Sequence, residues 1–247
     1  MQRNNTAETA ATTSPLQLRE TPTRKDTSMP YATIDAPFVP LYEAEHSATQ
    51  IRRSHDLHVP GPAQCEELTI ALYEYDQQEQ AEADDRAELP WTAMEAVARQ
   101  SRRRQALLSD NLRSTTILLS EHLLRRRISA VHGTAVARAQ LAFLRAAVKG
   151  TADWCDDRTV VRILPDSCRV IVPADFTIVR FLPGAEPGDF VYREADYRRH
   201  GAGNPQFESD TSSVANANAT WLRLLNNAVP SDDDTARVLD DVDAQLR

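Results

Sequence analysis

The chain has 247 residues, 41% of them apolar, which is enough for one domain with a buried core or for two small ones. A formal net charge of -8 and a sequence pI near 5.3 exclude a phosphate-binding surface spread over the whole protein, because duplex recognition depends on clustered basic side chains. Three cysteines without a CxxC pair exclude a disulfide framework, and no apolar run reaches the roughly 18 residues of a membrane span. We therefore expect a cytoplasmic protein that does not enter a membrane.

Residues 1–39 have the composition of a disordered leader. They are rich in Thr, Ala, Asn and Pro and show no sustained apolar period, so they cannot bury enough surface to offset the entropy of ordering. The pattern changes near Leu41, and we place a single domain over residues 40–247. The stretch from Leu41 to Gly61 mixes helical and extended signals and ends in the turn dipeptide Pro60-Gly61.

Two helices are expected next. In CEELTIALYEYDQQEQ, the apolar face would consist of Leu68, Ala71, Leu72 and Tyr75. After an acidic segment over residues 82–88, which we interpret as a solvated loop, Pro90 favours the start of a second helix. In that helix, WTAMEAVARQSRRRQALL, an apolar stripe of Trp91, Met94, Val97 and Leu108 would face the core. The opposite, solvated face would carry Arg99, Arg102, Arg103 and Arg104.

The apolar period then alternates between helix and strand. STTILLSEHLLRRR predicts a short strand around residues 116–119 that turns directly into a helix. Thr134 is the expected N-cap of the helix that follows, and Gly150 its end. Three β-branched and aromatic runs, TVVRILP, FTIVRFLP and DFVYREAD, predict strands, and two helices close the chain. This order indicates an α+β fold in which helices pack on a small mixed sheet.

The stretch HDLHVPGPAQCEE holds the strongest metal-like pattern. His55, His58 and Cys65 are residue types that zinc prefers. However, the two histidines lie in a segment that reads as extended, where residues three apart point to opposite faces of a strand. We therefore expect no metal site and no cofactor.

The catalytic motifs that a sequence can display are missing. The chain contains no G-x-S-x-G, G-x-G-x-x-G or G-x-x-x-x-G-K. Glu121 and His122 stand where a strand ends and a helix begins, and such a pair could do acid-base work if both side chains faced one pocket. Adjacent residues usually face apart, so the sequence leans toward a protein that is not an enzyme.

Several weak motifs occur in an order that resembles a known family. The runs LYEAEHSATQIRR, VPGPAQCEEL, VARQSRRRQALL and ILLSEHLLRR are followed by VHGTAVARAQLAFL, VVRILP, DFTIVRF and FVYRE. Together they resemble the C-terminal domain, known as domain of unknown function 5753, of actinobacterial antitoxin-like regulators of the XRE helix-turn-helix class. The resemblance covers about residues 41 to 230.

The resemblance implies a mixed α+β domain that receives a signal, either a small molecule or a small protein partner of toxin-antitoxin-like type. In that family a DNA-binding module precedes the domain, whereas here fewer than 40 residues do so. We therefore expect no direct contact with DNA, although pairing with a second copy or with a DNA-binding homologue stays open. The leading hypothesis is a stand-alone, non-catalytic ligand- or partner-binding domain that does not itself contact DNA.

Six positions match polar points of the family pattern and are the candidate ligand-binding residues. They are Tyr42, Glu45, Gln64, Glu121, Tyr192 and Glu194. A polar group at the edge of an apolar motif is either paired within the structure or points into a pocket. The alternative hypothesis is an isomerase or cyclase of specialised metabolism that was recruited from this domain, with Glu121 or Glu194 as its acid or base.

Overall fold

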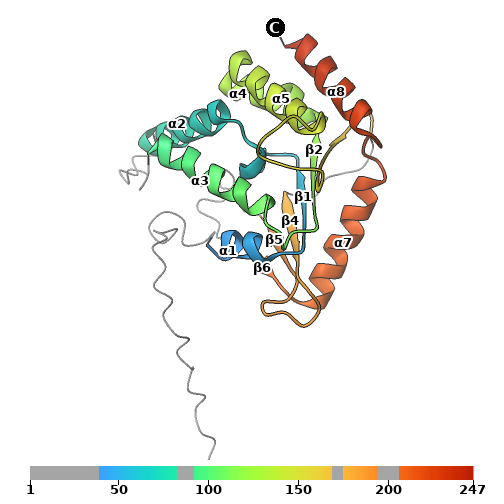
Figure 1. The fold of residues 1–247 in the computed structure, drawn as a ribbon. Helices are drawn as coiled ribbons and strands as arrows, with labels where there is room; N and C mark the ends of the chain where they lie inside the picture. Colours follow the sequence, from blue (N-terminus) through green and yellow to red (C-terminus); the bar gives the residue numbers. More distant parts are fainter. Residues whose placement is uncertain (1–38, 83–91, 169–174, 194–205, 247) are drawn as a thin grey trace, which may run out of the picture. The chain divides into compact units, whose positions relative to one another are not determined.

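The computed structural model describes residues 39–82, 92–168, 175–193 and 206–246, which belong to one compact unit (Figure 1). The helices of this part are α1 (Val39–Ser47), α2 (Glu66–Glu82), α3 (Ala93–Leu107), α4 (Ile128–His132), α5 (Thr134–Val148), α7 (Thr211–Leu225) and α8 (Asp232–Gln245). Two short turns complete them: the 3-10 turn η2 (Gly61–Ala63) and the π-helical turn η3 (Leu123–Arg127). The predicted leader, apart from Val39, lies outside the described residues, as do Pro90, Trp91 and all but the first residue of the acidic segment.

Six strands form one mixed sheet in the order β3-β2-β1-β4-β5-β6. They are β1 (Gln50–His55), β2 (Ser114–Ser120), β3 (Thr159–Leu164), β4 (Phe176–Arg180), β5 (Phe190–Arg193) and β6 (Gln206–Glu208). The first three strands are parallel and the last three pair antiparallel. The α+β class is therefore as predicted, and the runs TVVRILP, FTIVRFLP and DFVYREAD form β3, β4 and β5.

The parallel half of the sheet arises from two helical crossovers. Between β1 and β2 the chain passes through α2 and α3, and between β2 and β3 it passes through α4 and α5. After β3 it returns to the other side of β1, where β4 pairs antiparallel with it. The sequence did not predict β1 as a separate strand, because its polar residues in QIRRSH hide the apolar alternation that marks other strands.

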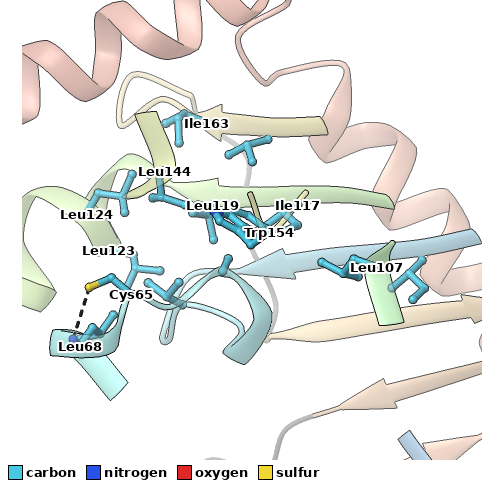
Figure 2. Packing of buried hydrophobic residues seen from close by; sticks show 14 of the residues in the cluster. Cys65, Leu68, Leu107, Ile117, Leu119, Leu123, Leu124, Leu144, Trp154 and Ile163 are labelled. Atoms are coloured by element: carbon cyan, nitrogen blue, oxygen red, sulfur yellow. Dashed lines mark hydrogen bonds between the residues drawn. The ribbon is translucent and has the colours of Figure 1, made fainter. Parts of the chain in front are cut away.

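The two faces of the sheet carry separate apolar clusters. On one face, Ile51, Ile117, Leu119 and Ile163 pack with side chains of α2, α5 and α8. Figure 2 shows this cluster, to which Trp154 and Leu119 both belong and in which the Cys65 Sγ accepts a hydrogen bond from the Leu68 N–H at 3.4 Å. On the other face, Leu118, Phe176, Ile178 and Val191 pack against Ala217, Trp221 and Leu224 of α7. Accordingly, α3 and α7 lie on opposite sides of the strands (Figure 1).

The prediction of which face of α3 is buried was wrong. Arg99 and Arg103 are buried together with Ala96, Ala106 and Leu107, whereas Met94 is 61% exposed and Leu108 is 39% exposed. The helix itself begins as its sequence allows, with a capping box between Thr92 and Glu95. The face of α3 that carries Arg103 is turned toward the core because the buried carboxylate of Glu45 on α1 accepts hydrogen bonds from this arginine.

The boundaries of α5 follow its capping signals, with one correction. Thr134 is the first residue of α5, and the N-cap is Gly133 at φ 87°, which provides no side-chain cap. Gly150 follows α5 at φ 65°, a left-handed conformation that glycine adopts without strain. None of the helices in the described ranges is long and apolar enough to cross a membrane.

Candidate functional site

Two of the candidate positions, Tyr42 and Glu45, belong to α1 and form a buried ionic cluster with α3 and β1. Glu45, only 1% exposed, accepts hydrogen bonds at Oε1 from the Arg53 Nη2 at 2.5 Å and the Arg103 Nη2 at 2.6 Å. Its Oε2 accepts from the Arg103 Nε at 3.0 Å. The Arg103 guanidinium lies over the Tyr42 ring, 4.5 Å from its centroid. We call Tyr42, Glu45, Arg53 and Arg103 the ionic cluster.

The electrostatics of the ionic cluster keep Glu45 ionised. Burial alone would raise the pKa of the Glu45 carboxyl, but the charges and hydrogen bonds of Arg103 and Arg53 outweigh it and lower that pKa. Next to the cluster, burial and repulsion by Arg103 and Arg102 lower the pKa of Arg99 to about 10, so its guanidinium is still charged at neutral pH. A carboxylate that is held between guanidinium groups stabilises the fold and does not exchange protons at neutral pH.

The turn at Val59-Pro60-Gly61 fits closely against the ionic cluster. A Cβ on Gly61 would lie 2.1 Å from the Gln100 Oε1 and 2.5 Å from the Arg103 Nη1. Only glycine leaves room for these two side chains as they stand. The predicted turn is therefore also a packing contact between the segment after β1 and α3.

Gln64, the third candidate, connects the same turn to the start of α2 through hydrogen bonds of its side chain. Its Nε2 donates to the Val59 carbonyl at 2.8 Å, and its Oε1 accepts from the Thr69 hydroxyl at 3.2 Å. Its carbonyl oxygen accepts from the Arg104 Nη1 at 2.9 Å. With its side chain 8% exposed and hydrogen-bonded at both ends, Gln64 has a structural role.

Of the remaining candidates, the structure describes Tyr192 and Glu121. Tyr192, 2% exposed, lies in β5 opposite Thr177, which lies opposite Arg53, so it shares the sheet face of the ionic cluster. Glu121 lies beyond the end of β2, where its carboxylate accepts a hydrogen bond from Arg125 and another from the Asp166 N–H at 2.9 Å. Glu194 lies outside the described residues.

The histidines of HDLHVPG meet at one carboxylate, contrary to our expectation that they would point apart. The chain bends after β1, so the Nδ1 atoms of His55 and His58 each lie 3.3 Å from the Asp175 Oδ2. Asp175 also accepts hydrogen bonds from the N–H groups of Asp56, Leu57 and His58. Burial would raise the pKa of the Asp175 carboxyl, but the two imidazoles and these N–H groups lower it far below its usual range.

This arrangement is a structural clasp between the end of β1 and the start of β4. Among the described residues, no group of three or more His, Cys, Asp or Glu side chains could hold a metal ion. Cys65, the third residue of the metal-like pattern, is 3% exposed, and burial raises the pKa of its thiol to about 12. A thiol that stays protonated is a poor zinc ligand, because metals bind the thiolate.

A shallow groove lies beside this clasp; together with the open solvent above it, it encloses about 350 Å³. Its aliphatic lining consists of Leu57, Val59, Leu68, Leu72, Leu123, Ile128 and Val131. Its polar lining residues are His58, Arg127 and His132. Apart from His58, the polar groups come from the segment LLRRRISAVH, which forms one wall of the groove. In this segment Leu123, Arg127 and Val131 recur at helical spacing, and this spacing is the signal from which the wall could have been predicted.

The position of the groove matches two features that accompany ligand sites. It adjoins the carboxyl end of β1, and β1 is the strand from which the sheet grows in one direction to β2 and β3 and in the other to β4. Ligands of open α/β sheets bind in crevices outside the carboxyl ends of parallel strands. One wall is the π-helical turn η3, and π-turns within helices occur frequently at functional sites.

The fold and the groove thus define a mixed α+β domain with a small apolar crevice at the end of its parallel strands. The family model described as Domain of unknown function (DUF5753) matches residues 38–241, so the chain belongs to that family. No curated protein and no solved structure matches the chain significantly.

Proposed function

We propose that this domain binds a ligand in the groove beside β1, as the sensing domain of an antitoxin-like regulator of the XRE class, and does not catalyse a reaction. The observation that carries the proposal is the groove itself, which combines an aliphatic lining with three polar side chains at the carboxyl end of the parallel strands. A small molecule or a short segment of a small partner protein could occupy it.

The chemistry of the carboxylates supports binding over catalysis. Burial would raise the pKa of Glu121, but the hydrogen bonds from Arg125 and from the Asp166 N–H outweigh it and lower that pKa. A carboxylate with a lowered pKa stays ionised at neutral pH, whereas a general acid or base works best with a pKa near the working pH. Glu45 and Asp175 are held in the same way. The enzymatic alternative therefore gains no support from Glu121.

Native mass spectrometry of the protein purified from its own host tests the proposal. Val131→Trp would fill the groove from its rim, where Val131 is 37% exposed, at little cost to folding. Leu222→Trp, on the exposed side of α7 at 52% exposure, is the matched control. We expect the wild-type chain and the control to retain a bound molecule that Val131→Trp loses. Equal retention by all three chains, or retention by none, would contradict the proposal.

A further inference from the structure

The groove has a one-sided charge. No carboxylate belongs to its lining residues, and its polar groups are the guanidinium of Arg127 and the imidazoles of His58 and His132. Asp175, which the lining residue His58 contacts, is 2% exposed and accepts three backbone N–H groups in addition to its imidazole contacts. Asp175 is therefore committed to the clasp and does not serve as the counter-ion of the groove.

Arg127 differs from the arginine two positions before it. Arg125 pairs with Glu121 and lies 4.0 Å from Asp166. For Arg127, no carboxylate within the described ranges lies at ion-pair distance, although its side chain is only partly exposed and lines the groove. A partly buried guanidinium beside apolar side chains is stabilised by an anion that brings its own apolar body.

We propose that the groove binds an amphipathic monoanion, an organic carboxylate whose apolar body lies on the aliphatic lining and whose carboxylate pairs with Arg127. This inference rests on the proposed function and names its ligand class. The planar guanidinium suits the two oxygens of a carboxylate. One such cation fits a single negative charge.

Isothermal titration of the full chain with three probes of equal chain length tests the ligand class. The probes are decanoate, decanol and decylamine, which present an anionic, a neutral and a cationic head on the same apolar body. We expect decanoate to bind about tenfold or more tightly than decanol and decylamine to bind weakest, because a desolvated charge-assisted hydrogen bond is worth at least that factor.

The matched variants are Arg127→Gln and Arg126→Gln, since Arg126 is an exposed neighbour on the same turn. Arg127→Gln should weaken decanoate binding about 10- to 100-fold and leave decanol binding unchanged, whereas Arg126→Gln should change neither. Arg127→Lys keeps the positive charge but lacks the planar guanidinium, so it should bind decanoate more tightly than Arg127→Gln and less tightly than wild type. Such partial recovery would show that the loss in Arg127→Gln comes from the missing charge and is not an effect on folding.

Three results would overturn the inference. Equal affinity of the wild-type chain for decanoate and decanol, or no decanoate binding at about 1 mM, would exclude the ligand class, as would equal losses in Arg127→Gln and Arg126→Gln. If decanol bound in that case and Val131→Trp abolished its binding, the groove would still be a ligand site, but its ligand would not be an anion. If native mass spectrometry showed equal retention of a bound molecule by all three chains, or retention by none, both the proposed function and this ligand class would be contradicted.

Discussion

Replacing Glu45 by Gln tests the structural role of the ionic cluster. The substitution keeps the shape of the side chain and one acceptor oxygen but removes the negative charge. Arg53 and Arg103, 1% and 8% exposed, would then face each other without the carboxylate that now lies between them. Breaking a buried ion pair by removing one partner costs about 3–5 kcal/mol.

For a domain of this size, each kcal/mol lost lowers the melting temperature by about 2–4 °C. The expected fall for Glu45→Gln is therefore about 6–20 °C by thermal unfolding, with a matching loss in urea titration. Glu43→Gln, an exposed substitution on the same helix, should change the free energy of unfolding by no more than about 0.5 kcal/mol.

A double-mutant cycle separates the pair from general effects. If Glu45→Gln and Arg103→Gln act through the same interaction, the double variant should lose less stability than the sum of the two single losses. A loss below about 1 kcal/mol for Glu45→Gln, or strict additivity with Arg103→Gln, would refute the assignment of the cluster as a structural element. Ligand binding in the groove should persist in Glu45→Gln at temperatures where the variant is folded.

Three further outcomes follow from the described contacts. Because the pKa of Asp175 is lower in the folded chain than the usual value near 3.9, its stabilisation is present above that value and is lost as the pH falls below it. Asp175→Asn should thus be less stable than wild type at pH 7, and urea titrations should show the difference shrinking below about pH 4; a constant difference would contradict this. Gly61→Ala should push aside the flexible ends of the Gln100 and Arg103 side chains and so lose less than the about 1–3 kcal/mol that overpacking costs in a rigid core. Adding Gln100→Ala should restore part of that loss, and a double variant no more stable than Gly61→Ala would contradict the close fit. Cys65 should resist iodoacetamide in the folded chain at pH 8 and react after unfolding in guanidinium, as peptide mapping would show; rapid labelling of the folded chain would contradict its burial and its pKa of about 12.

Much of the fold could be predicted because apolar periodicity and capping residues are local signals. The helix at residues 66–82 and the strands after residue 158 follow from their own side chains. The burial of α3 could not be predicted in this way. A helix with arginines on one face normally exposes them, and the reversal depends on Glu45, which is 58 residues away from Arg103 in the sequence.

The groove was not predicted from the sequence, and none of the candidate ligand-binding residues that the structure describes lines it. Tyr42, Glu45 and Gln64 are polar residues at the edges of apolar motifs, and the structure shows that they are paired within the fold. The meeting of His55 and His58 at Asp175 requires a bend after β1 and the antiparallel pairing of β4, which lies about 120 residues further along the chain. No local pattern reports such a contact.

Methyl NMR of the full chain during titration with decanoate tests the central claim most directly, namely that the groove is the ligand site and the ionic cluster is structural. The account predicts that the shifts appear first at the methyl groups of Leu72, Ile128 and Val131, which line the groove. Methyl groups on the opposite face, such as those of Ile178 and Leu224, should stay unchanged. Shifts centred on that face would contradict the assignment of the groove as the ligand site, and no shifts at any methyl group would contradict decanoate as its ligand.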